Sequence, residues 1–126
     1  MSDEKKKISA AELEKALREY VERANASPRA TKTLATWTCR VHIKANDVED
    51  AEFTYVVEQG RSLPVEVGLH GVPDLIVRGE SFDLAEIFWG DANPVSNYMQ
   101  GAIRTQGRAD DVMRLDAMAM FIFLNQ

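Results

Sequence analysis

The sequence has one cysteine, two histidines and no phosphate-binding loop, and each shortage excludes a class of function. The lone Cys39 cannot form an intramolecular disulfide or a zinc cluster, which favours a reducing compartment. His42 and His70 have no metal-ligand spacing to carboxylates. The glycines of "GDANPVSNYMQG" lack the spacing of a phosphate cradle, and no nucleophile-elbow sequence surrounds a serine. The sequence therefore predicts no metal, no cofactor and no enzymatic activity.

Long basic runs and long apolar runs are also missing. Fifteen basic and twenty acidic residues give a net charge of −5, with no basic block beyond residues 5–7. This balance argues against nucleic acid or a broad anionic membrane surface as a partner. The apolar run at residues 117–124 is far shorter than the roughly 20 residues of a spanning helix. The N-terminus has charges where a signal peptide needs apolar residues, so a cytoplasmic protein is expected.

The overall composition of the chain is that of a globular protein. Hydrophobic residues make up 45% and charged residues 28% of the 126 residues, enough to bury a core in a domain of ordinary size. We expect one domain over residues 1–126, with residues 1–7 frayed.

The first half of the chain predicts one helix followed by strands. Ser9 and Glu12 form a capping-box pattern, with Ile8 and Leu13 at the positions of a hydrophobic staple, so a helix is expected at about residues 10–25. Apolar residues then alternate, which predicts four consecutive strands at about 37–44, 52–58, 63–69 and 74–79. Consecutive strands favour a largely antiparallel sheet with one face that needs cover.

The second half predicts helices around a fifth strand. Ser81 is the expected N-cap of a helix that Gly90 terminates. Asn93-Pro94 is expected to open a short helix through Tyr98 and Met99. A strand at about 102–106 and a last helix at about 109–124 complete the chain.

The last helix has an acid on its apolar face. Projected at about 100° per residue, Asp116 lies opposite a charged sector formed by Asp110, Asp111 and Arg114. Four apolar residues surround it there: Val112, Met113, Met120 and Phe123. Two interpretations stay open, because a buried carboxylate needs a partner or a wet neighbour. Asp116 is either a core acid satisfied by a backbone amide, Arg78 or Arg104, or the polar end of a cavity.

The segment "PDLIVRGESFDLAEIFWGDANPVSNYMQGAIRTQGRADDVMRLDAMAMFIF" resembles the C-terminal half of the sterol carrier protein (type two) lipid-binding domain. The upstream helix and strands match in pattern, so the resemblance covers roughly residues 8–124. The matching parts occur in the family's order: Asp74 to Val77, Leu84 to Gly90, Asn93-Pro94, Met99 to Gly101, Ile103 to Gly107 and the closing helix.

The resemblance implies an α+β fold with a five-stranded, mostly antiparallel sheet covered by helices on one face. An apolar tunnel between them would take a fatty acid, a fatty acyl-CoA, a sterol or another lipid. Asp116 would meet a ligand hydroxyl or amine. The lining expected on this basis, with core packing as the alternative for each aromatic residue, comprises Phe88, Trp89, Tyr98, Met99, Val112, Met113, Met120 and Phe123.

The resemblance also implies a function: non-enzymatic binding and transfer or presentation of a lipid. The alternative is an accessory module that holds a hydrophobic intermediate for a partner enzyme, or that uses its apolar C-terminal stretch as a homodimer contact. Transient membrane contact is a further expectation. A small isomerase or hydrolase with Asp116 as base is a third hypothesis. The chain ends in Leu124-Asn125-Gln126 and not in a peroxisomal tripeptide, so a peroxisomal role is not expected.

Overall fold

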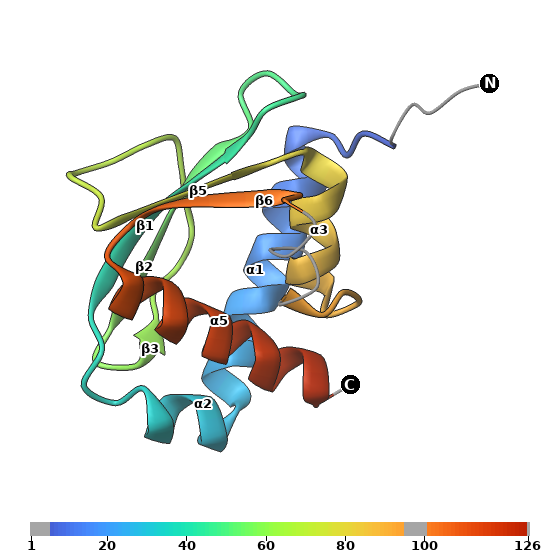
Figure 1. The fold of residues 1–126 in the computed structure, drawn as a ribbon. Helices are drawn as coiled ribbons and strands as arrows, with labels where there is room; N and C mark the ends of the chain where they lie inside the picture. The colour runs from blue at the N-terminus through green and yellow to red at the C-terminus, as the bar shows by residue number, and fades with distance from the viewer. Residues whose placement is uncertain (1–5, 95–100, 126) are drawn as a thin grey trace.

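Helices and strands cover most of the chain in the computed structural model, which describes residues 6–94 and 101–125 (Figure 1). The described helices are α1 (Ala10–Ala26), α2 (Pro28–Thr33), α3 (Ser81–Trp89) and α5 (Ala109–Leu124). The described strands are β1 (Cys39–Ala45), β2 (Glu52–Glu58), β3 (Arg61–Ser62), β4 (Glu66–Val67), β5 (Leu75–Gly79) and β6 (Ile103–Gly107).

The strands form a single mixed sheet in the order β3-β2-β1-β5-β6, with β4 also paired to β2. The β1 and β5 strands are parallel, with Val41 opposite Leu75, and the other pairs are antiparallel. Parallel neighbours need a long crossover, and the segment with β2, β3 and β4 supplies it. The predicted α+β class and mostly antiparallel sheet are confirmed.

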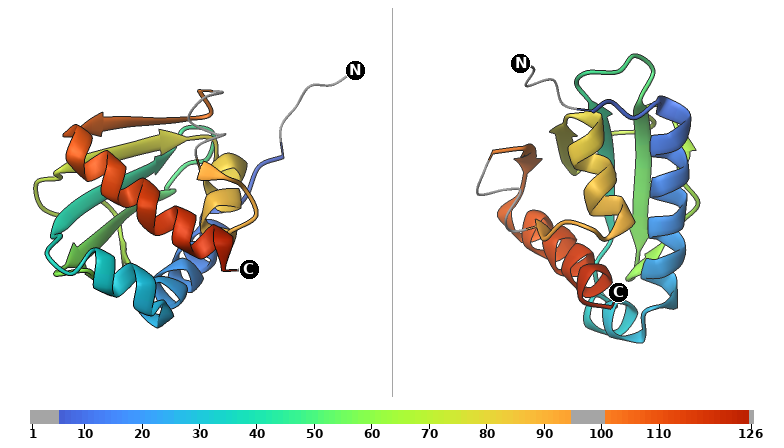
Figure 2. Two further views of the ribbon diagram at one scale, coloured as in Figure 1. Left: turned by 60° about the horizontal axis from the view of Figure 1, so that its bottom comes forward. Right: turned by 90° about the vertical axis from the view of Figure 1, so that its right-hand side faces the viewer.

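The helices cover one face of this sheet. Figure 2 shows α1, α3 and α5 side by side over the strands, with the loop that precedes β5 on the other side of the sheet. Inward-pointing residues of β1 and β2 alternate with outward ones, and Val41, Phe53 and Tyr55 are at most 1% exposed. The core therefore lies between the sheet and the three helices.

The start of α1 and the end of α3 follow their sequence patterns. The Ser9 hydroxyl accepts a hydrogen bond from the Glu12 amide at 3.1 Å, which confirms Ser9 as the N-cap. The Glu12 carboxylate accepts from the Ser9 hydroxyl in place of the backbone amide that a complete capping box uses. Ile8 and Leu13 are both buried, as a hydrophobic staple requires. Gly90 ends α3 with φ of 81°, in the left-handed region that glycine adopts without strain.

Two local predictions are wrong. Of the strand expected at 63–69 only β4 (Glu66–Val67) forms, and β3 (Arg61–Ser62) lies before it. Pro64, between the two short strands, has no amide hydrogen to donate to β2. Ser81 is the first residue of α3 and not its N-cap, a position that Glu80 takes. The Ser81 hydroxyl instead donates to Asp47 at 3.0 Å and accepts from the Ile8 amide at 2.9 Å. Both bonds join segments far apart in sequence, which no local pattern reveals.

The described residues include neither a membrane-spanning helix nor a metal-binding cluster. None of the helices there combines the length and the apolar character that crossing a bilayer requires. Within the same ranges, no group of three or more histidine, cysteine or acidic side chains is arranged to hold a metal ion.

Candidate ligand-binding cavity

An apolar cavity lies at the centre of the molecule, between the sheet and the helix layer. Its volume is about 30 Å³, which is enough for about one water-sized molecule. The sheet contributes Val41, Ile43, Tyr55, Val77 and Ile103 to its wall. Helices α1, α3 and α5, with the segment after α3, contribute Tyr20, Leu84, Ile87, Phe88, Pro94, Leu115 and Ala119.

The wall of this cavity is uncharged. Every described residue that lines it is apolar apart from the tyrosine hydroxyls. Most of the lining is buried, but Ile87 on α3 and Leu115 on α5 are partly exposed. The cavity therefore comes closest to solvent between α3 and α5. Such a wall suits a hydrocarbon chain and offers no cation to neutralise an acid.

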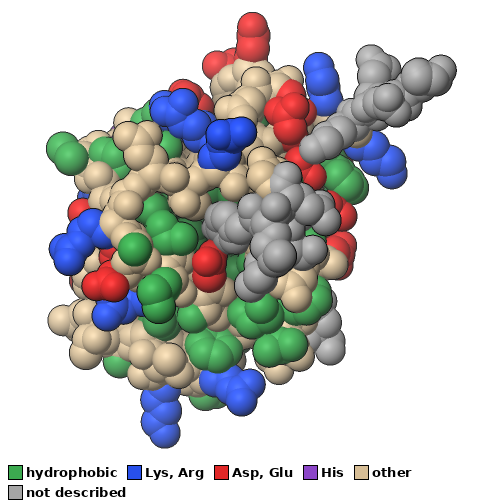
Figure 3. Space-filling model, in the orientation of Figure 1, with side chains coloured by type: hydrophobic (Ala, Val, Ile, Leu, Met, Phe, Trp, Pro, Cys, Tyr) green, Lys and Arg blue, Asp and Glu red, His purple; other side chains and the backbone are tan. Residues whose placement is uncertain are grey.

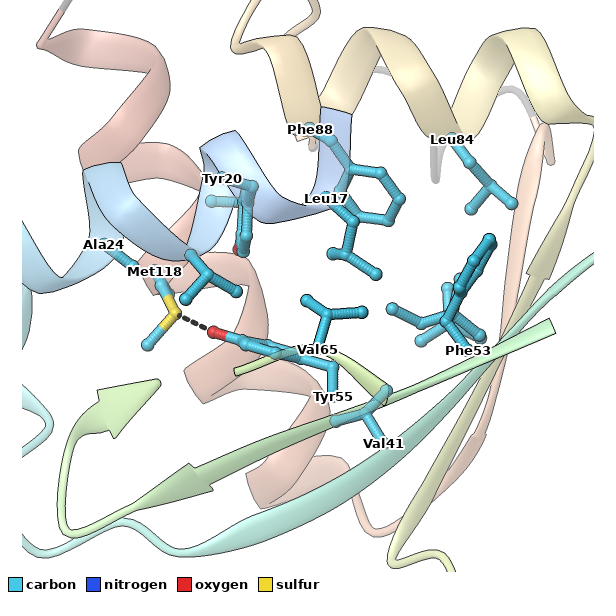
Figure 4. Close-up of a cluster of buried hydrophobic side chains, with 14 of the residues drawn as sticks. Leu17, Tyr20, Ala24, Val41, Phe53, Tyr55, Val65, Leu84, Phe88 and Met118 are labelled. Atoms are coloured by element: carbon cyan, nitrogen blue, oxygen red, sulfur yellow. Dashed lines mark hydrogen bonds between the residues drawn. The ribbon is translucent and has the colours of Figure 1, made fainter. Parts of the chain in front are cut away.

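Three aromatic rings of the cavity wall, those of Tyr20, Tyr55 and Phe88, pack together (Figure 4). Tyr20 packs edge-to-face against Tyr55 and Phe88, with ring centroids 5.9 and 5.5 Å away. This arrangement is the one that the ring quadrupoles favour. The Tyr55 hydroxyl lies 2.6 Å from the Ser62 hydroxyl and donates to the Met118 sulfur at 2.8 Å. The Tyr55 ring thus lines the apolar wall while its hydroxyl belongs to a buried polar cluster with Ser62 and Met118.

Burial controls the ionisation of the Tyr55 phenol and of the Cys39 thiol. It raises the pKa of the Tyr55 phenol well above its ordinary value, against a smaller lowering by the Ser62 hydrogen bond, so the phenol stays a donor at neutral pH. Burial also raises the pKa of the Cys39 thiol to about 12, with further contributions from the Asp111 and Asp74 carboxylates. Because the thiolate is the reactive form, Cys39 is not a nucleophile at neutral pH.

Helix α5 is rotated relative to the sequence projection. Its buried residues are Met118, Ala119 and Ile122, roughly a third of a turn from the predicted face. On this face the Trp37 indole donates a hydrogen bond to the Asp111 carboxylate at 3.0 Å. Asp111 therefore faces the protein, although the projection treated it as solvated.

The predicted lining residues are spread over several environments. Phe88 is 6% exposed and lines the cavity. Trp89 packs edge-to-face on Phe82 with centroids 6.1 Å apart. Met113 is 67% exposed, which corrects its expected place on the inner face of the helix. Val112, Met120 and Phe123 are half-buried on the flank of α5, outside the cavity wall. Tyr98 and Met99 lie outside the described residues.

Asp116 is half-buried on the same flank, and its Oδ1 atom is shielded from solvent. It is not part of the cavity wall. Arg78 and Arg104, the cations considered as its partners, are opposite each other on β5 and β6 and line an open depression on the outer face of the sheet. The sheet lies between these arginines and α5, which corrects the expectation that Arg78 or Arg104 pairs with Asp116.

Sequence reasoning missed four important lining residues: Tyr20, Tyr55, Leu115 and Ala119. Tyr20 and Tyr55 lie within the predicted first helix and second strand, where they continue the apolar pattern and nothing local marks them as lining residues. Leu115, Met118, Ala119 and Ile122 have the spacing of a buried helical stripe. That stripe was a usable signal, but the charges on Asp110 and Asp111 were given more weight.

Apolar side chains also gather on the surface of α5 (Figure 3). Met113 and Leu124 are 67% and 63% exposed. Helix α5 thus has more apolar surface than the core beneath it accommodates.

The chain has the fold of sterol carrier protein 2, which confirms the resemblance seen in the sequence at the level of the fold. A crystal structure of sterol carrier protein 2 matches with a TM-score of 0.63 and 14% identity over 86% of this chain and 94% of that one. No protein-family model and no curated protein matches the sequence.

Two further solved structures extend this comparison. A ubiquinone synthesis protein, UbiJ-SCP2, matches with a TM-score of 0.59 and 16% identity over 91% of both chains. Palmitated SCP2L2 from Aedes aegypti matches with a TM-score of 0.54 and 19% identity over 82% of this chain and 93% of that one. These identities are low, so the likeness concerns the fold.

Proposed function

We propose that this protein binds and transfers an elongated apolar ligand, such as a fatty acyl chain or another lipid, without catalysing a reaction. The observation that carries the proposal is the uncharged cavity between the sheet and helices α1, α3 and α5. The fold supports it, because one structure of the same fold is a palmitated protein.

The ligand has to enlarge the cavity. Its volume of about 30 Å³ is at most about a tenth of that of a typical small-molecule site. We propose that α5 moves, because it forms one wall with Leu115 and Ala119 and has half-buried apolar residues beside them. An outward shift would bring Val112, Met120 and Phe123 toward the ligand, and Asp116 toward a hydroxyl or amine on it.

The free energy is sufficient for useful affinity. Burial of ten methylene groups at about 0.8 kcal/mol each gives about 8 kcal/mol before ordering costs. That gross value corresponds to micromolar affinity. An apolar chain therefore needs few polar contacts to be held, which agrees with the composition of the wall.

The test is binding of diphenylhexatriene, an elongated hydrocarbon whose fluorescence rises in apolar surroundings. The wild-type protein is expected to bind it with a stoichiometry of one. Ala119→Leu adds side-chain volume inside the cavity and should weaken binding by about tenfold. Ala117→Leu adds the same volume on α5 outside the cavity wall and should leave binding within about twofold. A wild-type protein that binds no probe, or two variants with equal affinity, would contradict the proposal.

A second candidate function is an accessory role. UbiJ-SCP2, which shares the fold, is a ubiquinone synthesis protein, and this favours a module that presents a hydrophobic intermediate to a partner enzyme. Both functions use the same cavity. A cytoplasmic location stays a prediction from the sequence.

A further inference from the structure

Two buried hydroxyl groups, that of the cavity-wall residue Tyr55 and that of Ser62 next to it, have a weak final acceptor. The Tyr55 and Ser62 hydroxyls lie 2.6 Å apart, and either can donate to the other. If Ser62 donates, the Tyr55 hydrogen goes to the Met118 sulfur at 2.8 Å. If Tyr55 donates, the Ser62 hydrogen has the same sulfur at 4.0 Å. In both cases the pair ends on a thioether, which is a poor acceptor.

The two hydroxyls are held more firmly than the sulfur. Ser62 is fixed through its backbone, because its amide donates to the Asn25 side chain at 2.8 Å and its carbonyl accepts from it at 2.9 Å. Tyr55 is fixed by the β2 backbone and by the Tyr20 ring. Met118 has an unbranched, adaptable side chain. It lies next to the lining residue Ala119 on α5, so a shift of that helix displaces it.

We infer that Tyr55 and Ser62 form the binding site for one uncharged oxygen of the ligand, which replaces the Met118 sulfur as the acceptor. The inference rests on the proposed function and names its ligand class: an elongated apolar molecule with a hydroxyl, carbonyl or ester oxygen at its inserted end. An ionised carboxylate does not fit there, since the described cavity wall has no cation to compensate its desolvation. A fatty acid would insert with its methyl end first.

The experiment compares three probes, diphenylhexatriene, 1-dodecanol and dodecanoate at pH 8, on the wild-type protein and on Tyr55→Phe. The variant removes one hydroxyl and keeps the ring. It should weaken 1-dodecanol binding by about fivefold, the size of one net hydrogen bond. Diphenylhexatriene and dodecanoate, which place no oxygen at Tyr55, should bind both proteins equally.

A second variant keeps the inference testable if Tyr55→Phe fails to fold. Met118→Leu keeps the side-chain volume and removes the competing sulfur, so the affinity for 1-dodecanol should rise relative to that for diphenylhexatriene. Unchanged ratios of 1-dodecanol to diphenylhexatriene affinity in Met118→Leu would overturn the inference, as would equal losses of all three probes in Tyr55→Phe. Failure of the wild-type protein to bind any probe would instead reject the proposed function.

Discussion

The two longest helices, α1 and α5, cover the same face of the sheet in different ways. Helix α1 has six buried residues among its 17, whereas α5 has three among its 16. Leu13 and Leu17 on α1 are completely buried, but Met113 and Leu124 on α5 are about two-thirds exposed. The α1 side of the helix layer is therefore fully packed, whereas the α5 side leaves large apolar side chains exposed to solvent. A cavity that must enlarge can do so at lower cost on the α5 side.

The largest expected contrast is in stability. Leu17→Ala removes a fully buried side chain and should lower the free energy of unfolding by about 3 kcal/mol. Met113→Ala, on the exposed flank of α5, should change it by less than about 0.5 kcal/mol. Urea unfolding followed by circular dichroism measures both. Similar losses in the two variants would show that α5 is packed as tightly as α1.

The hydrogen bond from the Trp37 indole to Asp111, at the start of α5, allows a test of how firmly α5 alone is held. Asp111→Ala leaves the Trp37 indole, in a side chain 3% exposed, without its acceptor, at a cost of about 1–2 kcal/mol. Amide hydrogen exchange should become faster in α5 and stay unchanged in α1. Asp110→Ala is the matched control, because it removes the same charge from the same helical turn at an exposed position. Equal exchange in both variants would mean that the bond does not hold α5.

The smallest expected effect concerns the pH dependence of stability. It arises from Cys39 on β1, whose pKa the Asp111 carboxylate of α5 helps to raise. The folded protein keeps the Cys39 proton until pH about 12, whereas an ordinary thiol, with a pKa of 9.0, loses it earlier. The unfolded state therefore releases this proton first, and stability falls as the pH rises through 9 toward 12. Between pH 9 and 10 this contribution falls by about 1 kcal/mol.

Cys39→Ala isolates that contribution. Thermal unfolding of the variant at pH 9 and 10 should show a weaker loss of stability than the wild-type protein. Because the Asp111 carboxylate contributes to the raised pKa, Asp111→Ala should reduce the pH dependence partly. A slope identical in wild type and Cys39→Ala would show that the thiol does not titrate differently on folding.

Elements with strong local patterns could be predicted from the sequence. The first helix, the first two strands and the last helix lie within about two residues of their expected bounds. Capping by Ser9 and termination at Gly90 depend on neighbours in the sequence, so they were readable. The third strand failed because its alternation continued through Pro64 and hid the missing donor.

The candidate site was harder to predict from the sequence because it depends on contacts between segments that are far apart along the chain. The stripe of Leu115, Met118, Ala119 and Ile122 indicates the buried face of α5, but the hydrogen bond between Asp111 and Trp37 joins segments far apart in the sequence. Charge was the competing guide to the solvated face, and it failed at Asp111, whose carboxylate accepts from the buried Trp37 indole. The Tyr55, Ser62 and Met118 cluster likewise unites β2, β3 and α5.

The parallel pairing of β1 with β5 has a consequence for synthesis on the ribosome. These strands are neighbours in the middle of the sheet, yet Val41 must wait for Leu75 before the pair can form. Until then, β1 exposes an apolar strand edge of the kind that recruits other chains. Loop closure over such a distance slows folding, so the nascent chain should need protection from aggregation during translation of this crossover.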